Sequence, residues 1–192
     1  METVALEPIE PVELEAGPFR LRPWRPDDLE ALWSAFQDPE IRMWNGGGVA
    51  TREDALALLG RRAGRYPDHV SWAVVDPASD ELLGSVSLHS IDPVGTDGQV
   101  GYWTSPAARG RGVAVAAVDA VCRWAFGTLP VDRIELFHAV ENTASGRVAE
   151  KAGFVQEGRS RRSYRYGDGV KHDELLWARL ADDPAPDLST RS

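Results

Sequence analysis

Two glycines that alternate with two arginines form the segment of this sequence best suited to ligand binding. They lie in the stretch Gln99-Val-Gly-Tyr-Trp-Thr-Ser-Pro-Ala-Ala-Arg-Gly-Arg-Gly-Val-Ala114. Strand signals cover residues 99–104, and an apolar run predicts a helix from about Gly112 to Phe126. Glycines at such a junction leave backbone N–H groups unobstructed, and the helix N-terminus adds partial positive charge. Because Arg109 and Arg111 add further charge, the segment predicts a pyrophosphate site.

The same segment departs from two common phosphate-binding motifs. A P-loop needs a Lys-Ser or Lys-Thr pair after its glycines, and none follows here. A dinucleotide fingerprint needs a third glycine or alanine where this chain has Val115, and it needs parallel βα units. Successive strands in this sequence disfavour such a cofactor, and an ordinary exposed turn stays an alternative for the stretch by itself.

The composition favours a single α/β domain, and its acidic balance favours a cationic partner such as an amine. The chain has 192 residues and a net charge of −9, which argues against nucleic-acid or membrane binding as its main task. Neither a signal peptide nor an apolar run of about 20 residues is found, so we expect a cytoplasmic protein. Cys122 is interpreted as a core residue. The four histidines show no metal-ligand spacing, so no metal is predicted.

The order of predicted elements indicates a mixed sheet. Residues 1–17 are predicted to be a flexible arm, residues 18–180 the domain, and residues 181–192 a disordered tail. Strands are predicted at 19–24, 71–75, 82–91, 99–104, 133–140, 154–166 and 170–180, and helices at about 27–36, 51–65, 112–126 and 142–152. Asp38-Pro39 is interpreted as a helix stop, and Gly46 to Gly48 as a flexible loop. The result is an α/β (α+β) fold with a mostly antiparallel seven-stranded sheet and about four helices.

Several ordered blocks of the sequence resemble one enzyme family. Arg109-Gly-Arg-Gly112-Val-Ala114 is similar to the acyl-CoA motif Arg/Gln-x-x-Gly-x-Gly/Ala of the GNAT superfamily of N-acetyltransferases. Asn142-Thr-Ala-Ser145-Gly-Arg-Val-Ala-Glu-Lys151-Ala-Gly-Phe154 resembles a pattern of its ribosomal-protein-alanine (Rim-type) branch. Further similar blocks are residues 21–28, residues 101–103, and Glu157-Gly158 with Arg161 and Gly169. The resemblance covers residues 19–180 and implies the GNAT fold, in which strands 99–104 and 133–140 splay apart.

The resemblance also implies a co-substrate, acetyl-CoA, and the residues that bind it. The pyrophosphate would be bound by backbone N–H groups of Arg109, Gly110, Arg111, Gly112, Val113 and Ala114. The pantetheine arm would pair with the main chain of Tyr102, Trp103 and Thr104, and Asn142 would form a hydrogen bond with it. A backbone amide of that strand would polarise the thioester carbonyl.

The acid and the base of the implied reaction are less fully specified. Many relatives place a tyrosine seven residues after the helix-opening asparagine, where this chain has Ala149. Ser145 is the implied replacement as thiol partner, although it could simply satisfy backbone groups of the helix. Some relatives carry a glutamate where this chain has Phe137, so Glu135, His138 or a water relay stay open as the base.

The expected activity is acetyl transfer from acetyl-CoA to a primary amine by direct attack, without an acyl-enzyme. The acceptor would be a protein N-terminus or a small-molecule amine, and Trp44 and Asn45 would line its pocket. A homodimer is common among relatives. The alternative is a non-catalytic acyl-CoA-binding or regulatory module of the same fold.

Overall fold

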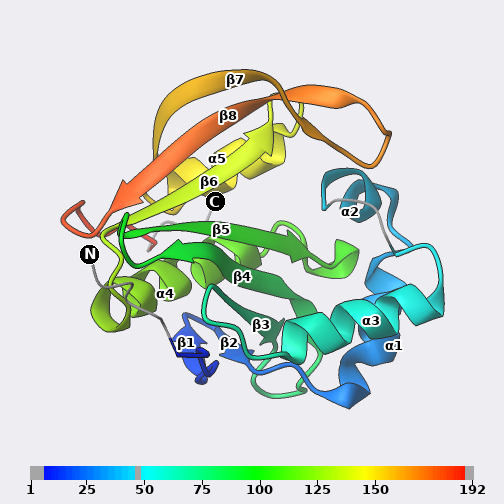
Figure 1. Ribbon diagram of the computed structural model, residues 1–192. Helices are drawn as coiled ribbons and strands as arrows, with labels where there is room; N and C mark the ends of the chain where they lie inside the picture. Colours follow the sequence, from blue (N-terminus) through cyan, green and yellow to red (C-terminus); the bar gives the residue numbers. More distant parts are fainter. Residues whose placement is uncertain (1–6, 46–48, 189–192) are drawn as a thin grey trace.

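One mixed sheet runs through the part of the chain that the computed structural model describes, residues 7–45 and 49–188 (Figure 1). Its strands are ordered β1-β2-β3-β4-β5-β6-β8-β7. Their bounds are Leu14–Ala16 (β1), Phe19–Arg22 (β2), His69–Val75 (β3), Leu82–Asp92 (β4), Asp97–Thr104 (β5), Arg133–Ala139 (β6), Val155–Arg165 (β7) and Lys171–Leu180 (β8). Only the β5–β6 pairing is parallel among these, which confirms the mixed, mostly antiparallel sheet.

The helices cover both faces of this sheet (Figure 1). They are α1 (Leu29–Ala35), α2 (Pro39–Trp44), α3 (Arg52–Ala63), α4 (Val113–Thr128) and α5 (Thr143–Lys151). Strand β3 contributes side chains to two hydrophobic clusters, one on each face of the sheet, because successive side chains of a strand point to opposite faces. Trp72 and Val74 pack in the cluster that contains α4 and α5. Ala73 and Val75 pack in the cluster that contains α1 to α3.

Two elements were not predicted from the sequence, and each has an identifiable cause. The first is the edge strand β1, which lies in the predicted flexible arm and pairs with β2. Buried Trp72 donates its indole N–H to the carbonyl oxygen of Val12 at 2.7 Å, and Ile9 is only 9% exposed. The arm is therefore packed over residues 9–16, because a tertiary contact with Trp72 overrides its Pro- and Glu-rich composition.

The second unpredicted element is α2, and it begins where the sequence was interpreted as a helix stop. Asp38 is the N-cap of α2, since its carboxylate accepts a hydrogen bond from the N–H of Ile41 at 2.9 Å. Proline suits the first helical position because its missing N–H would have no partner there. Asp38-Pro39 therefore both ends α1 and starts α2. The predicted loop at Gly46 to Gly48 lies outside the described residues.

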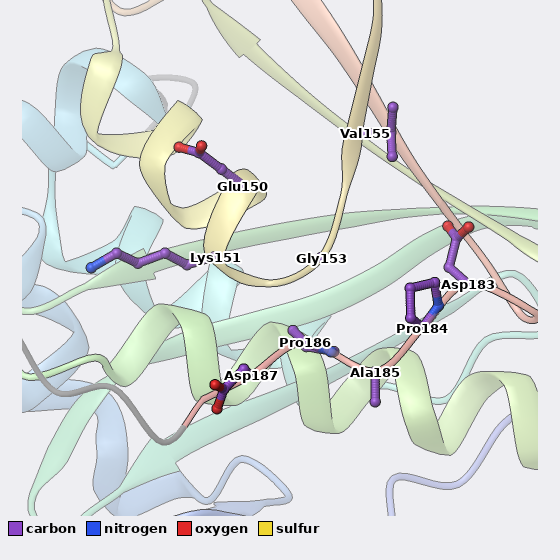
Figure 2. Close-up of a pocket in the computed structure, with 9 residues that line it drawn as sticks. All are labelled: Glu150, Lys151, Gly153, Val155, Asp183, Pro184, Ala185, Pro186 and Asp187. Atoms are coloured by element: carbon purple, nitrogen blue, oxygen red, sulfur yellow. The ribbon is translucent and has the colours of Figure 1, made fainter.

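The C-terminal segment is described as far as residue 188, so residues 189–192 of the predicted tail lie outside the described part. Its residues 183–187, together with the end of α5, enclose a hollow of about 540 Å³ (Figure 2). Pro186 lies about 3.4 Å from the point where a Cβ on Gly153 would stand. The segment therefore packs against the turn that follows α5.

The parting of β5 and β6 is the feature of the sheet that matters most for function. The two strands pair only from Asp97 to Gln99 on β5 and from Arg133 to Glu135 on β6. Beyond that point β6 keeps its pairing with β8 as far as Ala139, while β5 stays with β4 (Figure 1). Because each strand is held on its other side, the two edges diverge without unfolding.

A buried ion pair fixes the start of the α-helical layer, and it gives a stability prediction. Arg22 and Asp28 are 2% and 6% exposed and form two hydrogen bonds of 2.8 and 2.9 Å. We expect Asp28→Asn to lower the free energy of unfolding by about 3 kcal/mol, because the buried guanidinium loses its charged partner. The matched variant Asp80→Asn, which removes the more exposed carboxylate paired with Arg22, should cost at most about 1 kcal/mol. Urea unfolding measures the free energy of unfolding of both variants. Equal losses would contradict the larger contribution expected from the buried Arg22–Asp28 pair.

Candidate active site

A cleft of about 1360 Å³ occupies the space between the parted strands. It extends from the start of α4 past β5 and β6 to α2 and the start of α5. The predicted site residues that line it are Trp44, Asn45, Tyr102, Trp103, Thr104, Arg109, Gly110, Arg111, Gly112, Val113, Ala114, His138, Asn142 and Ser145. Glu135 does not line it. The tertiary structure therefore brings together nearly the whole set that the sequence predicted.

The Gly-rich loop presents its backbone amides to this cleft. Gly110 and Gly112 have φ angles of +76° and +80°, a region that residues with a Cβ rarely adopt. Arg109 donates its N–H to Pro106 at 3.3 Å, and Ala116 donates to Gly112 at 3.0 Å. Between them, the N–H groups of residues 110–115 have no partner in the described chain. This run of free donors at a helix N-terminus fits the pyrophosphate of a nucleotide.

The two arginines of the loop make contacts that position it, in addition to carrying positive charge. Arg109 forms ion pairs with Asp38 at 2.6 Å and Glu40 at 3.1 Å. Arg111 lies over the ring of Phe19, with 5.9 Å between its Cζ and the ring centroid. The charge of Arg109 is thus partly neutralised, which differs from the two free positive charges that the sequence suggested. Its ion pairs hold the loop against the N-terminus of α2.

A pair of hydroxyl groups lies inside the cleft where α5 meets β5. The oxygens of Tyr102 and Ser145 are 2.6 Å apart. Burial raises the pKa of Tyr102 to about 12, although the hydrogen bond with Ser145 opposes this rise. The phenol is therefore protonated at neutral pH. Sequence reasoning assigned Tyr102 only a main-chain role, since its contact with Ser145 joins positions 43 residues apart.

Asn142 orients this hydroxyl pair by capping α5. Its side-chain oxygen accepts a hydrogen bond from the N–H of Ser145 at 3.2 Å. The side-chain NH₂ of Asn142 is then directed away from that bond, and Asn142 lines the cleft. The cap therefore leaves the side-chain NH₂ of Asn142 available for the hydrogen bond that was expected with a pantetheine arm.

Neither base candidate from the sequence is a free proton acceptor in this structure. Glu135 is bound by Arg133 at 2.9 Å, at the closed end of the β5–β6 pair. His138 lines the cleft, but Trp177 donates its indole N–H to Nε2 at 3.0 Å. Its Nδ1 then carries the proton and donates to the carbonyl of Ala139 at 2.8 Å. Burial lowers the pKa of His138, so it stays neutral with both ring nitrogens engaged.

Sequence reasoning missed two residues: Tyr166, which lines the cleft, and Glu174, which accepts a hydrogen bond from it. Tyr166 lines the cleft, and its ring centroid is 5.5 Å from that of Trp44 in an edge-to-face contact. Its hydroxyl donates to Glu174 at 2.9 Å. The available signal was weak: Glu174 ends a polar run at the start of β8, and no sequence motif links it to Tyr166, eight residues earlier across the hairpin.

These features define a class: an α/β domain that holds a nucleotide pyrophosphate on a Gly-rich helix N-terminus and admits an extended chain between parted strands. Comparison with known families places the chain within that class. A model of the acetyltransferase (GNAT) domain matches residues 19–155. The chain belongs to the GNAT acetyltransferase family.

Individual relatives agree with this family assignment. The chain is 29% identical over 103 residues to the ribosomal-protein-serine acetyltransferase of Escherichia coli (strain K12), which is 54% of this chain and 57% of that protein. The chain thus spans little more than half the length of this relative, as it does for other curated relatives of similar identity.

Solved structures show the same fold over nearly the whole chain. A GNAT-family acetyltransferase from Bacillus anthracis superposes with a TM-score of 0.80 at 24% identity, covering 90% of this chain and 100% of that one. RimL, a ribosomal L7/L12 alpha-N-protein acetyltransferase solved with coenzyme A, gives a TM-score of 0.74 at 19% identity, covering 88% and 98%. The predicted GNAT fold is therefore confirmed, with one strand and one helix more than the sequence predicted.

The expected enzyme class and co-substrate follow from the family. The family assignment and the names of the relatives support acetyl-CoA-dependent N-acetyl transfer as the enzyme class. Over residues 7–45 and 49–188, no group of three or more His, Cys, Asp or Glu side chains is placed to hold a metal ion. In the same stretches, no helix has the length and apolar character needed to cross a membrane.

Proposed function

We propose that this chain transfers the acetyl group of acetyl-CoA to the N-terminal α-amine of a protein. The observation that carries the proposal is a continuous path, from the unpartnered amides of residues 110–115, along the free edge of β5, to the Tyr102–Ser145 hydroxyl pair. In acetyl-CoA, a diphosphate, an amide-containing arm and a thioester follow one another in the same order as these three features of the cleft. The name of the Escherichia coli relative supports a ribosomal-protein acceptor.

The residues of the chain divide the work of this reaction. Loop amides bind the pyrophosphate, and the main chain of residues 100–104 pairs with the pantetheine arm in place of a strand. A backbone N–H of β5 donates to the thioester carbonyl, where negative charge develops during attack. The neutral amine forms the new C–N bond, and the C–S bond breaks. Ser145, with Tyr102 behind it, supplies a proton to the departing sulfur.

An α-amine is a more readily activated acceptor than a lysine. A protein N-terminus has a pKa of about 7.7–8.0, against about 10.4 for lysine. At pH 7, about one α-amine in ten is already neutral, compared with about one lysine in 2500. Acetylation of an α-amine therefore requires much less assistance from a base.

The test is a steady-state assay of coenzyme A release with a matched acceptor panel. The panel contains a peptide with a free N-terminal serine, the same peptide with a blocked N-terminus and an internal lysine, and a linear polyamine. We expect the free N-terminus to be preferred at least tenfold in kcat/KM. Preference for the polyamine would contradict the proposed acceptor. Tight acetyl-CoA binding without thiol release from any amine would favour the non-catalytic alternative.

Trp44 is proposed to form a wall of the acceptor pocket, which gives a second testable prediction. Its ring lines the cleft and packs edge-to-face against Tyr166. We expect Trp44→Ala to raise the acceptor KM about tenfold, because aromatic and cation–π contacts contribute about 1–2 kcal/mol. Acetyl-CoA affinity should not change. Trp44→Phe keeps an aromatic ring, so its acceptor KM should stay close to that of the unmodified chain. Unchanged acceptor KM and kcat in Trp44→Ala would contradict this role.

A further inference from the structure

Glu174 differs from the other buried carboxylates of the described chain in having no cationic partner. Asp28 and Asp119 are each at most 6% exposed, and each forms an ion pair with a buried arginine at 2.8–2.9 Å. Glu174 is 8% exposed, yet its only side-chain hydrogen bond within residues 7–45 and 49–188 comes from the neutral phenol of Tyr166. A buried carboxylate without a cation is costly to the fold, so its presence points to function.

The phenol of Tyr166 connects this carboxylate to the cleft. Its ring is 8% exposed and lines the cleft, while its hydroxyl donates to Glu174 at 2.9 Å. Burial and the neighbouring carboxylate raise the pKa of Tyr166 well above its usual value, so the phenol stays protonated. A phenol that donates one hydrogen bond still has lone pairs to accept another. Tyr166 can therefore pass a proton inward from the cleft to Glu174.

Backbone contacts fix this pair beside the proposed acceptor pocket. The hairpin after β7 is attached to α2, because Gly167 donates its N–H to the carbonyl of Met43 at 3.0 Å. A Cβ on Gly167 would stand only 2.2 Å from the carbonyl oxygen of Arg42, so only glycine allows this approach. The contact holds Tyr166 against Trp44, the residue next to Met43.

None of the charged and titratable groups around Glu174 in the described chain forms an ion pair with it. From β6, the residue opposite Glu174 is Ala139, and its neighbour His138 is neutral. From β7, the residue opposite is Ser160. On the neighbouring positions of β8, Asp173 is paired with Arg159, and His172 is paired with Asp168 and Glu141. Hydrogen bonds with Asp168 and Glu141 raise the pKa of His172, whose ring packs edge-to-face on Tyr166 and Trp44 at centroid distances of 5.6 and 6.2 Å. Glu174 thus remains the acceptor that a cation in the cleft could reach through Tyr166.

We propose that Tyr166 and Glu174 form the proton-accepting pair that prepares the acceptor amine for attack. This inference rests on the proposed function. The ammonium N–H bond breaks and its proton passes to the Tyr166 oxygen, while the phenol proton passes to Glu174. The amine becomes neutral, Tyr166 is unchanged in charge, and Glu174 becomes a carboxylic acid that later returns its proton to water. A second proton leaves the nitrogen after attack and replaces the one that the Tyr102–Ser145 pair gives to the sulfur.

The lack of an ion-pair partner for Glu174 within residues 7–45 and 49–188 is what this role requires. An arginine beside Glu174 would repel the incoming ammonium and weaken the carboxylate as a proton acceptor. The aromatic rings of Trp44 and Tyr166 attract a cation without neutralising the carboxylate. The pair therefore combines binding of the charged acceptor with removal of its proton.

The decisive measurement is the pH profile of kcat/KM for the free N-terminal serine peptide in Glu174→Gln and Tyr166→Phe. Without the pair, the rate should follow the neutral fraction of the amine and rise tenfold per pH unit below pH 8. At pH 6, where about 1% of the amine is neutral, we expect a loss of about 100-fold relative to the unmodified chain. The loss should shrink to about twofold at pH 9. The affinity for acetyl-CoA, measured by calorimetry, should stay within twofold.

Matched variants separate this role from a structural one. Glu53→Gln removes the same charge from the exposed first turn of α3 and should leave the profile unchanged. Tyr166→Phe keeps the ring that packs on Trp44, so it decides the question if Glu174→Gln fails to fold. A flat loss at all pH values, or an unchanged profile in Tyr166→Phe, would overturn the proposal.

A spectroscopic measurement tests the pair without any acceptor. The chain has four tyrosines, so ¹³Cζ signals of labelled tyrosine can be assigned individually. At neutral pH the Tyr166 signal should differ between the unmodified chain and Glu174→Gln, because the phenol donates to a carboxylate in the first and to a neutral amide in the second. An identical Tyr166 signal in both chains would show that the pair does not exist. If the unmodified chain acetylates no amine in the panel while the pair is present, the proposed function fails and not the pair.

Discussion

Replacing Gly110 and Gly112 together by alanine is expected to weaken acetyl-CoA binding about 100-fold. Both residues have positive φ angles, near +76° and +80°. An alanine in this region costs about 1–2 kcal/mol, so two alanines either strain the loop by about 2–4 kcal/mol or force it to relax. Relaxation moves the N–H groups of residues 110–115 off the pyrophosphate. Since 1.4 kcal/mol is tenfold in affinity, the expected range centres near 100-fold.

The control for this variant uses the same substitution at two other glycines. Gly60 in α3 and Gly127 in α4 have no positive φ, and an added Cβ at either would meet no atom within 4 Å. The double variant Gly60→Ala/Gly127→Ala should bind acetyl-CoA normally and unfold at slightly higher temperature, since alanine favours helices. Isothermal calorimetry measures both affinities. Normal acetyl-CoA affinity in Gly110→Ala/Gly112→Ala would exclude the loop as the pyrophosphate site.

Replacing Ser145 by alanine is expected to lower kcat about 100-fold while leaving acetyl-CoA affinity nearly unchanged. A positioned proton donor contributes roughly 10²–10⁴-fold to such a reaction. Ser145 lies 2.6 Å from the Tyr102 hydroxyl and lines the cleft. The fold should tolerate the change, because the capping bond of Asn142 is made to the backbone N–H of residue 145 and not to its side chain.

A double-mutant cycle separates a joint role from two independent ones. If Ser145 and Tyr102 act as one donor, Tyr102→Phe should lower kcat by a similar factor, and the double variant should be little worse than either single variant. Thr143→Ala, at the first position of α5, is the control and should retain kcat. Full kcat in Ser145→Ala, or strictly multiplicative losses in the cycle, would contradict the shared role.

The part of the site that depends on local backbone geometry could be predicted from the sequence. The glycines of the loop, the helix that follows them and the Asn142 cap are each encoded within a few residues. Such segments have the same conformational preferences wherever they occur, because φ restrictions and helix capping involve near neighbours in the chain. The location of the cofactor loop and of Ser145 in one cleft is therefore consistent with a prediction made from sequence patterns.

Other local patterns allow two physical interpretations. In two places the chain adopts a conformation that the sequence analysis did not predict. Asp38-Pro39 can end a helix or begin one, and here it does both. The Pro- and Glu-rich segment before residue 17 can stay loose or add an edge strand, and the hydrogen bond from Trp72 to Val12 holds part of it against the sheet. Only a partner distant in sequence decides between such alternatives.

The sequence by itself indicated the fold class, and it predicted the Gly-rich loop as the acyl-CoA site and Ser145 as the thiol partner. The tertiary structure decided which side chains face one another across the cleft: Tyr102 beside Ser145, His138 engaged on both nitrogens, and Tyr166 between Trp44 and Glu174. The physical reason is that proton chemistry depends on distances of about 3 Å between groups on separate strands and helices. Those distances are set by the packing and register of the whole sheet, which no short segment encodes.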